Sequence, residues 1–143
     1  MIFSAKYLYL IIIAIAILFF LKKNKEIKTK LFFFSLINLP IIFIISKIAG
    51  LLYYSPRPFV AKHFAPLISH AANNSFPSEH SLISFAVSSI VFVFNPKVGI
   101  FLFALSFIVG FSRVYVGVHY PIDILGSFII AAATTSIVKS VLK

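Results

Sequence analysis

Long apolar runs are the feature that most constrains what this chain can fold into. The first run, Ile2–Leu21, contains the string YLYLIIIAIAILFFL and has about the 20 residues that a helix needs to cross a lipid bilayer. Across the chain, 61% of the 143 residues are hydrophobic, and the mean hydropathy is +1.08. A soluble domain of this length cannot bury so much apolar surface. The sequence therefore predicts an integral membrane protein.

Four further apolar runs follow the first, over residues 31–54, 80–94, 98–111 and 121–138. No glycine- or proline-rich linker divides them, so we expect one domain over residues 1–143. Its predicted fold is an all-α, polytopic membrane bundle of about five transmembrane helices. We expect the first run to be retained and not cleaved as a signal peptide, because it lacks a small-residue cleavage site and its lysines follow it.

The distribution of positive charge predicts how the bundle is oriented. The chain has 13 Lys and Arg residues against 3 Asp and Glu, a formal net charge of +10. With five spans, eight lysines fall on one side of the membrane, and the positive-inside rule makes that side cytoplasmic. They are Lys22, Lys23, Lys25, Lys28, Lys30, Lys97, Lys139 and Lys143. The predicted location is therefore the cell (plasma) membrane, with anionic lipid as a neighbour.

Some classes of function are disfavoured by composition alone. Basic residues split across a bilayer do not form the single patch that nucleic-acid binding requires. The chain has no cysteine, which excludes disulfides, thiolate metal sites and a cysteine nucleophile. The oligomeric state does not follow from the sequence.

Three polar segments are predicted to share the extracytoplasmic face. They are SPRPF (55–59), FPSEH (76–80) and SRVYVGVHYPID (112–123), and they come from distant parts of the chain. Ionisable groups at the mouth of a membrane bundle are costly and are functional candidates by default. Their convergence predicts one site.

The residue types in these segments suit phosphate chemistry. The planar guanidinium groups of Arg57 and Arg113 match phosphate oxygens. Ser78 precedes a predicted helix, where its hydroxyl can cap that helix and the free N–H groups of the first turn favour an anion. His80 and His119 can exchange protons near neutral pH.

Asp123 lies four residues after His119, with Pro121 between them. Pro121 disfavours helical angles at the residue before it, which places His119 just outside the last helix and Asp123 in its first turn. The carboxylate can then accept a hydrogen bond from one ring nitrogen, leaving the other unprotonated and nucleophilic.

Other polar residues are better explained by membrane anchoring or packing. Lys6 and Lys62 are expected to snorkel to the interface, and His63 and His70 to be solvated loop side chains. Serines in the third run are expected to pack between helices, and several tyrosines to form an interfacial belt. The serines are Ser84, Ser88 and Ser89, and the tyrosines are Tyr53, Tyr54 and Tyr120.

At this point the residues resemble a known family, the type 2 phosphatidic acid phosphatase superfamily, membrane relatives of the vanadium haloperoxidases. SRVYVGVHYPID matches its S-R-x5-H-x3-D motif in full, and PSEH matches P-S-G-H with Glu79 in place of Gly. Arg57–Pro58 matches the end of K-x6-R-P, but the lysine position is Gly50, and the nearest lysine is Lys47, three residues earlier. Lys47 either reaches the same phosphate or snorkels. The motif region spans residues 47–123.

The resemblance implies a mechanism without a metal or cofactor. His119 would attack phosphorus to form a phosphohistidine, Asp123 would orient it, and His80 would protonate the leaving oxygen and then help to activate water. The phosphate oxygens would be held by Arg57, Arg113, Ser78 and Lys47.

The resemblance also implies a substrate. The acidic residue at position 79, with YYSPRPF and NNSFPSEH around it, is similar to the bacterial undecaprenyl-diphosphate phosphatases of the bacitracin-resistance type. Such an enzyme converts undecaprenyl diphosphate to undecaprenyl phosphate and phosphate, which recycles the lipid carrier of peptidoglycan synthesis. Two alternatives stay open: a phosphatase for phosphatidylglycerophosphate or phosphatidate, and a non-catalytic membrane protein that binds lipid phosphates.

Overall fold

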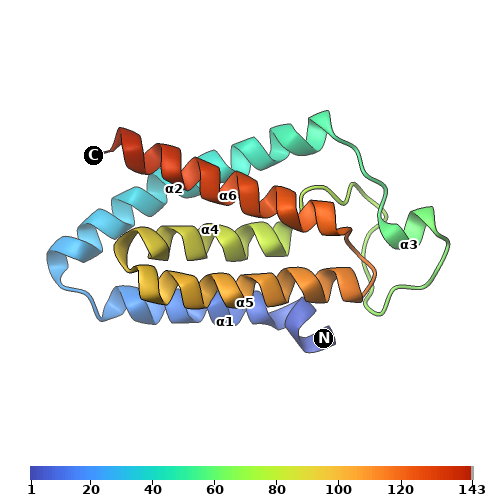
Figure 1. Cartoon of the computed structure of the whole chain (residues 1–143), viewed down its shortest axis with the longest axis horizontal. Coiled ribbons are helices and arrows are strands. Elements are labelled where there is room, and N and C mark those ends of the chain that lie inside the picture. The colour runs from blue at the N-terminus through green and yellow to red at the C-terminus, as the bar shows by residue number, and fades with distance from the viewer. Residues whose placement is uncertain (143) are drawn as a thin grey trace.

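The computed structural model describes residues 1–142 and contains, within that range, helices and no strand (Figure 1). Four helices are long and apolar enough to cross a membrane: α1 (Ile2–Leu21), α2 (Lys25–Leu52), α5 (Pro96–Tyr115) and α6 (Pro121–Val141). A shorter apolar helix, α4 (Glu79–Phe94), completes the bundle, and α3 (Pro58–Ala61) is a single turn in the loop between α2 and α4. The predicted all-α, multi-pass membrane fold is confirmed.

Two helices, α2 and α5, differ most from the predicted apolar runs. α2 begins at Lys25 instead of Leu31, because Asn24 caps it by accepting a hydrogen bond from the Ile27 N–H at 2.9 Å. Lys and Glu are good helix formers, and the Lys30–Glu26 ion pair at 2.7 Å supports the added turn.

α5 likewise starts earlier and ends later than the predicted span of 98–111. The side chain of Asn95 accepts a hydrogen bond from the Val98 N–H at 3.2 Å, and Pro96 occupies the first turn. At its other end, α5 continues through Ser112 and Arg113 to Tyr115. Arg113 therefore projects from the last turn of a helix and not from a loop.

α4 is the centre of the bundle and packs most closely against α5 and α6 (Figure 1). Its Phe85 is fully buried and meets Phe107 of α5 and Phe128 of α6, with ring centroids 5.0 and 5.3 Å away. Edge-on aromatic contacts of this kind are favourable. α1 packs along α5, and α2 packs along α6.

Small and polar side chains join the helices inside the bundle. The hydroxyls of Ser88 in α4 and Ser106 in α5 lie 2.9 Å apart, and the Asn38 amide of α2 donates to the Thr135 hydroxyl of α6 at 2.8 Å. Interhelical hydrogen bonds of this kind help to hold helices together in lipid, where the hydrophobic effect does not. Ser84, Ser88 and Ser89 are all buried, as their predicted packing role requires.

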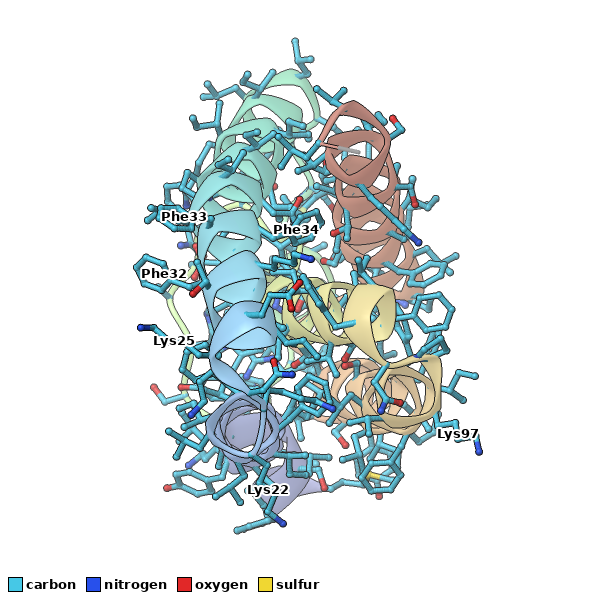
Figure 2. The ribbon with its side chains drawn as sticks, turned by 90° about the vertical axis from the view of Figure 1, so that its left-hand side faces the viewer. Lys22, Lys25, Phe32, Phe33, Phe34 and Lys97 are labelled. Carbon is cyan, nitrogen blue, oxygen red and sulfur yellow. The ribbon has the colours of Figure 1, made fainter. Side chains whose placement is uncertain are left out.

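The two ends of the bundle differ in character. Figure 2 looks onto one end, where Lys22, Lys25 and Lys97 lie near the turns that join α1 to α2 and α4 to α5. The α2–α4 loop, α3 and the α5–α6 connection lie at the opposite end (Figure 1). The predicted separation of the lysine-rich and polar segments is therefore present among the described residues, and Lys143 lies outside them.

Candidate active site

The three polar segments meet at the end of the bundle that holds α3. The backbone N–H of Ser78 donates to the carbonyl of Asp123 at 3.4 Å, and the Ser127 hydroxyl donates to the Ser78 carbonyl at 3.0 Å. These contacts join the start of α4 to the start of α6. Arg57 reaches the same place from the long loop, so residues far apart in the sequence form one cluster.

Arg57 is held by the loop that precedes α4. The Ser75 N–H donates to the Ser55 carbonyl at 2.9 Å, which lays the 73–75 segment beside Arg57. The guanidinium then donates from Nε to the Asn73 side chain at 2.9 Å, from Nη2 to the Asn74 carbonyl at 3.3 Å and from Nη1 to the Val118 carbonyl at 2.9 Å. Arg57 is 5% exposed, so its position is set by a fixed set of acceptors.

The His119 imidazole lies between a carboxylate and a guanidinium. Its Nδ1 is 3.3 Å from Oδ2 of Asp123, and its Nε2 is 3.2 Å from Nη1 of Arg57. Oδ2 of Asp123 also accepts the Tyr120 N–H at 2.8 Å, which fixes the carboxylate at the N-terminus of α6. A carboxylate on Nδ1 favours the tautomer with its proton there, and Nε2 then carries the free electron pair.

Electrostatics keep this imidazole neutral. Burial lowers the pKa of His119 to about 4, helped by the positive charges of Arg57 and Arg113 and opposed by the hydrogen bond to Asp123. Burial also lowers the pKa of Arg57, against the opposing charges of Asp123 and Glu79. At neutral pH, the site therefore presents a free ring nitrogen beside a guanidinium that stays cationic.

Arg113 is a buried cation with spare hydrogen-bonding capacity. It is 2% exposed, and its Nη1 donates to the Ala5 carbonyl of α1 at 3.1 Å. Its Nε and Nη2 find no partner among the described residues. A buried donor without a partner is costly, and an anion at this place would satisfy both.

Ser78 and His80 lie at the start of α4, but not all of their predicted contacts are present. Ser78 occupies the N-cap position, yet its hydroxyl makes no capping bond and instead donates to the Ser81 hydroxyl at 3.1 Å. The prediction that the Ser78 side chain caps the helix is wrong, because Ser81 in the first turn competes for it. The His80 ring packs edge-on against Tyr9 of α1, with centroids 4.7 Å apart.

Lys47 and Glu79, the two departures from the family motifs, form an ion pair. Lys47 Nζ lies 3.1 Å from Glu79 Oε1, and both side chains are largely exposed. The pair lines a cavity of about 380 Å³ together with Arg57, His70 and Asn73. Lys47 therefore reaches the site from one helical turn before Gly50 in α2, and its ammonium meets the carboxylate that replaces the motif glycine.

Sequence reasoning missed four participants in this arrangement. Tyr9 and the Ala5 carbonyl come from α1, whose largely apolar sequence carries no motif that indicates a role in a site. Asn73 holds Arg57, and His70 was expected to be a solvated loop residue. Instead, the His70 ring is half-buried and its centroid lies 6.1 Å from that of His119. Among residues 1–142, no group of three His, Asp or Glu side chains is arranged as metal ligands.

Comparison with known proteins places the chain in a family. Residues 5–143 match the PAP2 superfamily. Undecaprenyl-diphosphatase BcrC from Bacillus subtilis (strain 168) is 44% identical over 88 residues, which is 62% of this chain and 46% of the relative. Phosphatidylglycerophosphatase B from the same organism is 35% identical over 91 residues, or 56% of this chain and 44% of the relative. The chain thus spans about half the length of these curated relatives.

The fold is also similar to a solved structure. The crystal structure of LpxE from Aquifex aeolicus superposes with a TM-score of 0.76 at 19% sequence identity, covering 97% of this chain and 84% of that chain. At this identity the likeness concerns the fold: a helical bundle with the same arrangement of its elements.

Proposed function

The chain belongs to the PAP2 superfamily, and from this membership and the geometry of its site we propose that it is a membrane lipid-phosphate phosphatase that hydrolyses undecaprenyl diphosphate. The observation that carries the proposal is the His119 imidazole, with Asp123 at 3.3 Å from one ring nitrogen and Arg57 at 3.2 Å from the other. This arrangement suits attack on an anionic phosphorus better than binding alone, because it leaves Nε2 unprotonated and in contact with a cation.

In the first step, Nε2 of His119 attacks the terminal phosphorus. A bond forms from Nε2 to phosphorus while the bond from phosphorus to the leaving oxygen breaks, and the leaving group keeps that electron pair. Arg57 and the unpartnered nitrogens of Arg113 hold the equatorial oxygens as charge redistributes. Asp123 stabilises the positive charge that develops on the imidazole.

In the second step, water replaces the histidine. His80, which gave its proton to the leaving oxygen in the first step, now accepts a proton from the attacking water. The new bond from water oxygen to phosphorus releases inorganic phosphate and restores neutral His119. Ser78 is proposed to contact the phosphate from the start of α4, and Lys47 through the cavity that it lines with Arg57.

The proposed substrate rests on the relatives and on one local feature. A relative named as an undecaprenyl-diphosphatase shares 44% identity over its matched region. A relative named as a phosphatidylglycerophosphatase, at 35% identity, supports the second candidate, a phosphatase for glycerolipid monophosphates. We favour the diphosphate because the relative named for it shares the higher identity with this chain, 44% against 35%.

The proposed reaction needs no metal, because Arg57, Arg113 and Lys47 supply positive charge to the phosphate oxygens. The proposed location is the plasma membrane with the site on the extracytoplasmic side, in line with the positive-inside rule applied to the lysine-rich end. The chain has no cysteine, so a single Ser69→Cys variant reports orientation. A membrane-impermeant thiol reagent should label it in intact cells, and labelling only after lysis would reverse the proposed orientation.

Phosphate release by the full chain in detergent, with chelator present, tests the proposed activity. The panel contains undecaprenyl diphosphate, phosphatidylglycerophosphate and phosphatidate. His119→Ala should reduce release by several orders of magnitude, whereas His63→Asn, at an exposed histidine of the same loop, should not. Equal release by wild type and His119→Ala would remove the proposed nucleophile. Lipid binding without turnover would instead favour a non-catalytic lipid-binding protein.

A further inference from the structure

The cavity beside His119 has a composition that the transferred phosphate alone does not require. It has a volume of about 380 Å³ and lies between α2, the start of α4 and the loop segment 70–74. Its polar lining includes Lys47, Arg57, His70, Asn73 and Glu79. Of these, His70 lies outside every segment that the sequence shares with the family.

We propose that this cavity is the subsite for the second phosphate of a lipid diphosphate, the one that stays on the lipid, and that His70 is a specificity residue there. This inference rests on the proposed function and deepens it. It makes the chain selective for a diphosphate over a monophosphate with the same tail.

Arg57 links the cavity to the reacting centre. Its Nη1 lies 3.2 Å from Nε2 of His119, and the same side chain lines the cavity. A phosphorus positioned for attack by Nε2 therefore has this guanidinium on its cavity side. The bridging oxygen of a diphosphate and the phosphate beyond it then lie toward His70 and Asn73.

The His70 ring lines this space, and its Nε2 donates a hydrogen bond to a phosphate there when the ring is protonated, because in the neutral ring the one N–H is the Nδ1–H that faces the Ala71 carbonyl. It is half-buried, its ring centroid is 6.1 Å from that of His119, and its Nδ1 is 3.3 Å from the Ala71 carbonyl. No described residue forms a hydrogen bond with its Nε2. Burial and the positive charge of Arg57 lower the pKa of His70. A phosphate bound between His70 and Arg57 opposes the effect of the Arg57 charge, because a nearby anion favours the protonated ring.

Glu79 fits this subsite because of Lys47. A lone carboxylate in the cavity would repel a phosphate, but Glu79 accepts one hydrogen bond from Lys47 at 3.1 Å. An ammonium group has three donors, so two remain for a ligand. Glu79 thus holds Lys47 at the cavity, although Lys47 lies three residues before the lysine position of the family motif.

The chemistry of the leaving group explains why such a subsite would favour a diphosphate. When Nε2 attacks the terminal phosphorus of a diphosphate, the departing group is a phosphate monoester, whose bridging oxygen takes the electron pair and then the proton from His80. Cations and N–H donors around that phosphate stabilise the charge as it develops. A lipid monophosphate instead expels an alkoxide, which needs a proton from His80 and has no phosphate to place in the cavity.

The test compares substrates with identical tails, farnesyl diphosphate and farnesyl phosphate, on wild type and His70→Ala. Losing one hydrogen bond to a charged group corresponds to about tenfold or more. We expect kcat/KM for the diphosphate to fall by about that factor and kcat/KM for the monophosphate to fall by less than about threefold. His70→Gln retains an N–H donor and should recover part of the selectivity. Asn73 is unsuitable as a probe because it also holds Arg57.

His63→Asn is the matched control, since His63 is an exposed loop histidine at a φ of 52°, which Asn tolerates. It should leave the ratio of the two kcat/KM values unchanged. An unchanged ratio in a folded His70→Ala protein, or an equal fall for both substrates, would overturn the subsite. If wild type and His119→Ala released equal phosphate from every substrate, the proposed function would be overturned, and the subsite with it.

Discussion

Replacing Asp123 by Asn changes one oxygen of a buried carboxylate and tests how the site activates His119. Asp123 is fully buried, and its Oδ2 accepts the Tyr120 N–H at 2.8 Å and lies 3.3 Å from Nδ1 of His119. Its Oδ1 has no hydrogen-bond partner among the described residues. The Asn side chain can therefore keep its oxygen on Tyr120 and place its NH₂ where Oδ1 was, so the helix cap and the fold should survive.

The expected effect follows from the charge that is lost. During attack, His119 becomes cationic while its Nδ1 remains about 3.3 Å from the carboxylate. Two unit charges at about that distance attract by about 5 kcal/mol at an effective dielectric constant of about 20, which corresponds to a rate factor of about 10³ to 10⁴. Because this charge develops only in the transition state, kcat should fall by about that factor while KM changes by a few-fold.

The assay is phosphate release from undecaprenyl diphosphate by the detergent-solubilised chain, with rapid quenching to trap acid-labile phosphoenzyme. Glu26→Gln is the matched control, because it makes the same carboxylate-to-amide change at an exposed residue paired only with Lys30. A folded Asp123→Asn protein with kcat within tenfold of wild type would refute the reasoning, since a neutral amide would then serve His119 as well as a carboxylate does.

Three further predictions concern other parts of the fold. Because burial lowers the pKa of His119 to about 4 from the usual 6.5, its ring should stay neutral until the pH approaches 4, and the stability that it contributes should decline as pH falls from 6.5 to 4. Histidine ¹⁵N NMR spectra measure the midpoint, and a value of 6.5 or above would contradict the prediction. Tyr9→Leu removes the edge contact to His80 and should lower kcat by about 3- to 10-fold, whereas Tyr9→Phe keeps it; equal rates in both variants would exclude this positioning role. In Gly99→Ala, the new Cβ would lie 2.4 Å from Cα of Phe92, so overpacking of about 1–3 kcal/mol should exceed the helix-propensity gain of about 1 kcal/mol and lower Tm; a Tm at or above wild type would show that α4 and α5 can separate without cost.

The His119–Asp123 pair and the membrane helices were predictable because their causes are local in the chain. Apolar runs of bilayer length can satisfy their backbone in lipid only as helices. Pro121 sets the start of α6, and four residues then bring Asp123 back beside His119. Nothing from elsewhere in the chain is needed for this contact, so the spacing alone was informative.

Helix ends were less predictable, since hydropathy does not detect capping. Lys25–Lys30 is hydrophilic and was assigned to a loop, yet the Asn24 cap and the Glu26–Lys30 pair make it the first part of α2. Ser78 shows the converse: a serine at the N-cap position predicted a side-chain cap, but its hydroxyl turns to Ser81. In both cases the outcome depends on hydrogen bonds and ion pairs of particular side chains, to which hydropathy is blind.

Only the tertiary structure decided which residues complete the site. Tyr9 meets His80, and Ala5 meets Arg113, from a helix whose sequence shows only that it is apolar. His70 of the α2–α4 loop lies beside His119, which precedes α6. Lys47 of α2 reaches Glu79 of α4. The sequence by itself determined the helices, the end of the bundle where polar groups collect, and the pairing of His119 with Asp123. The remaining contacts depend on how α1, α2 and the α2–α4 loop pack around α4, and a uniform apolar surface does not encode that packing residue by residue.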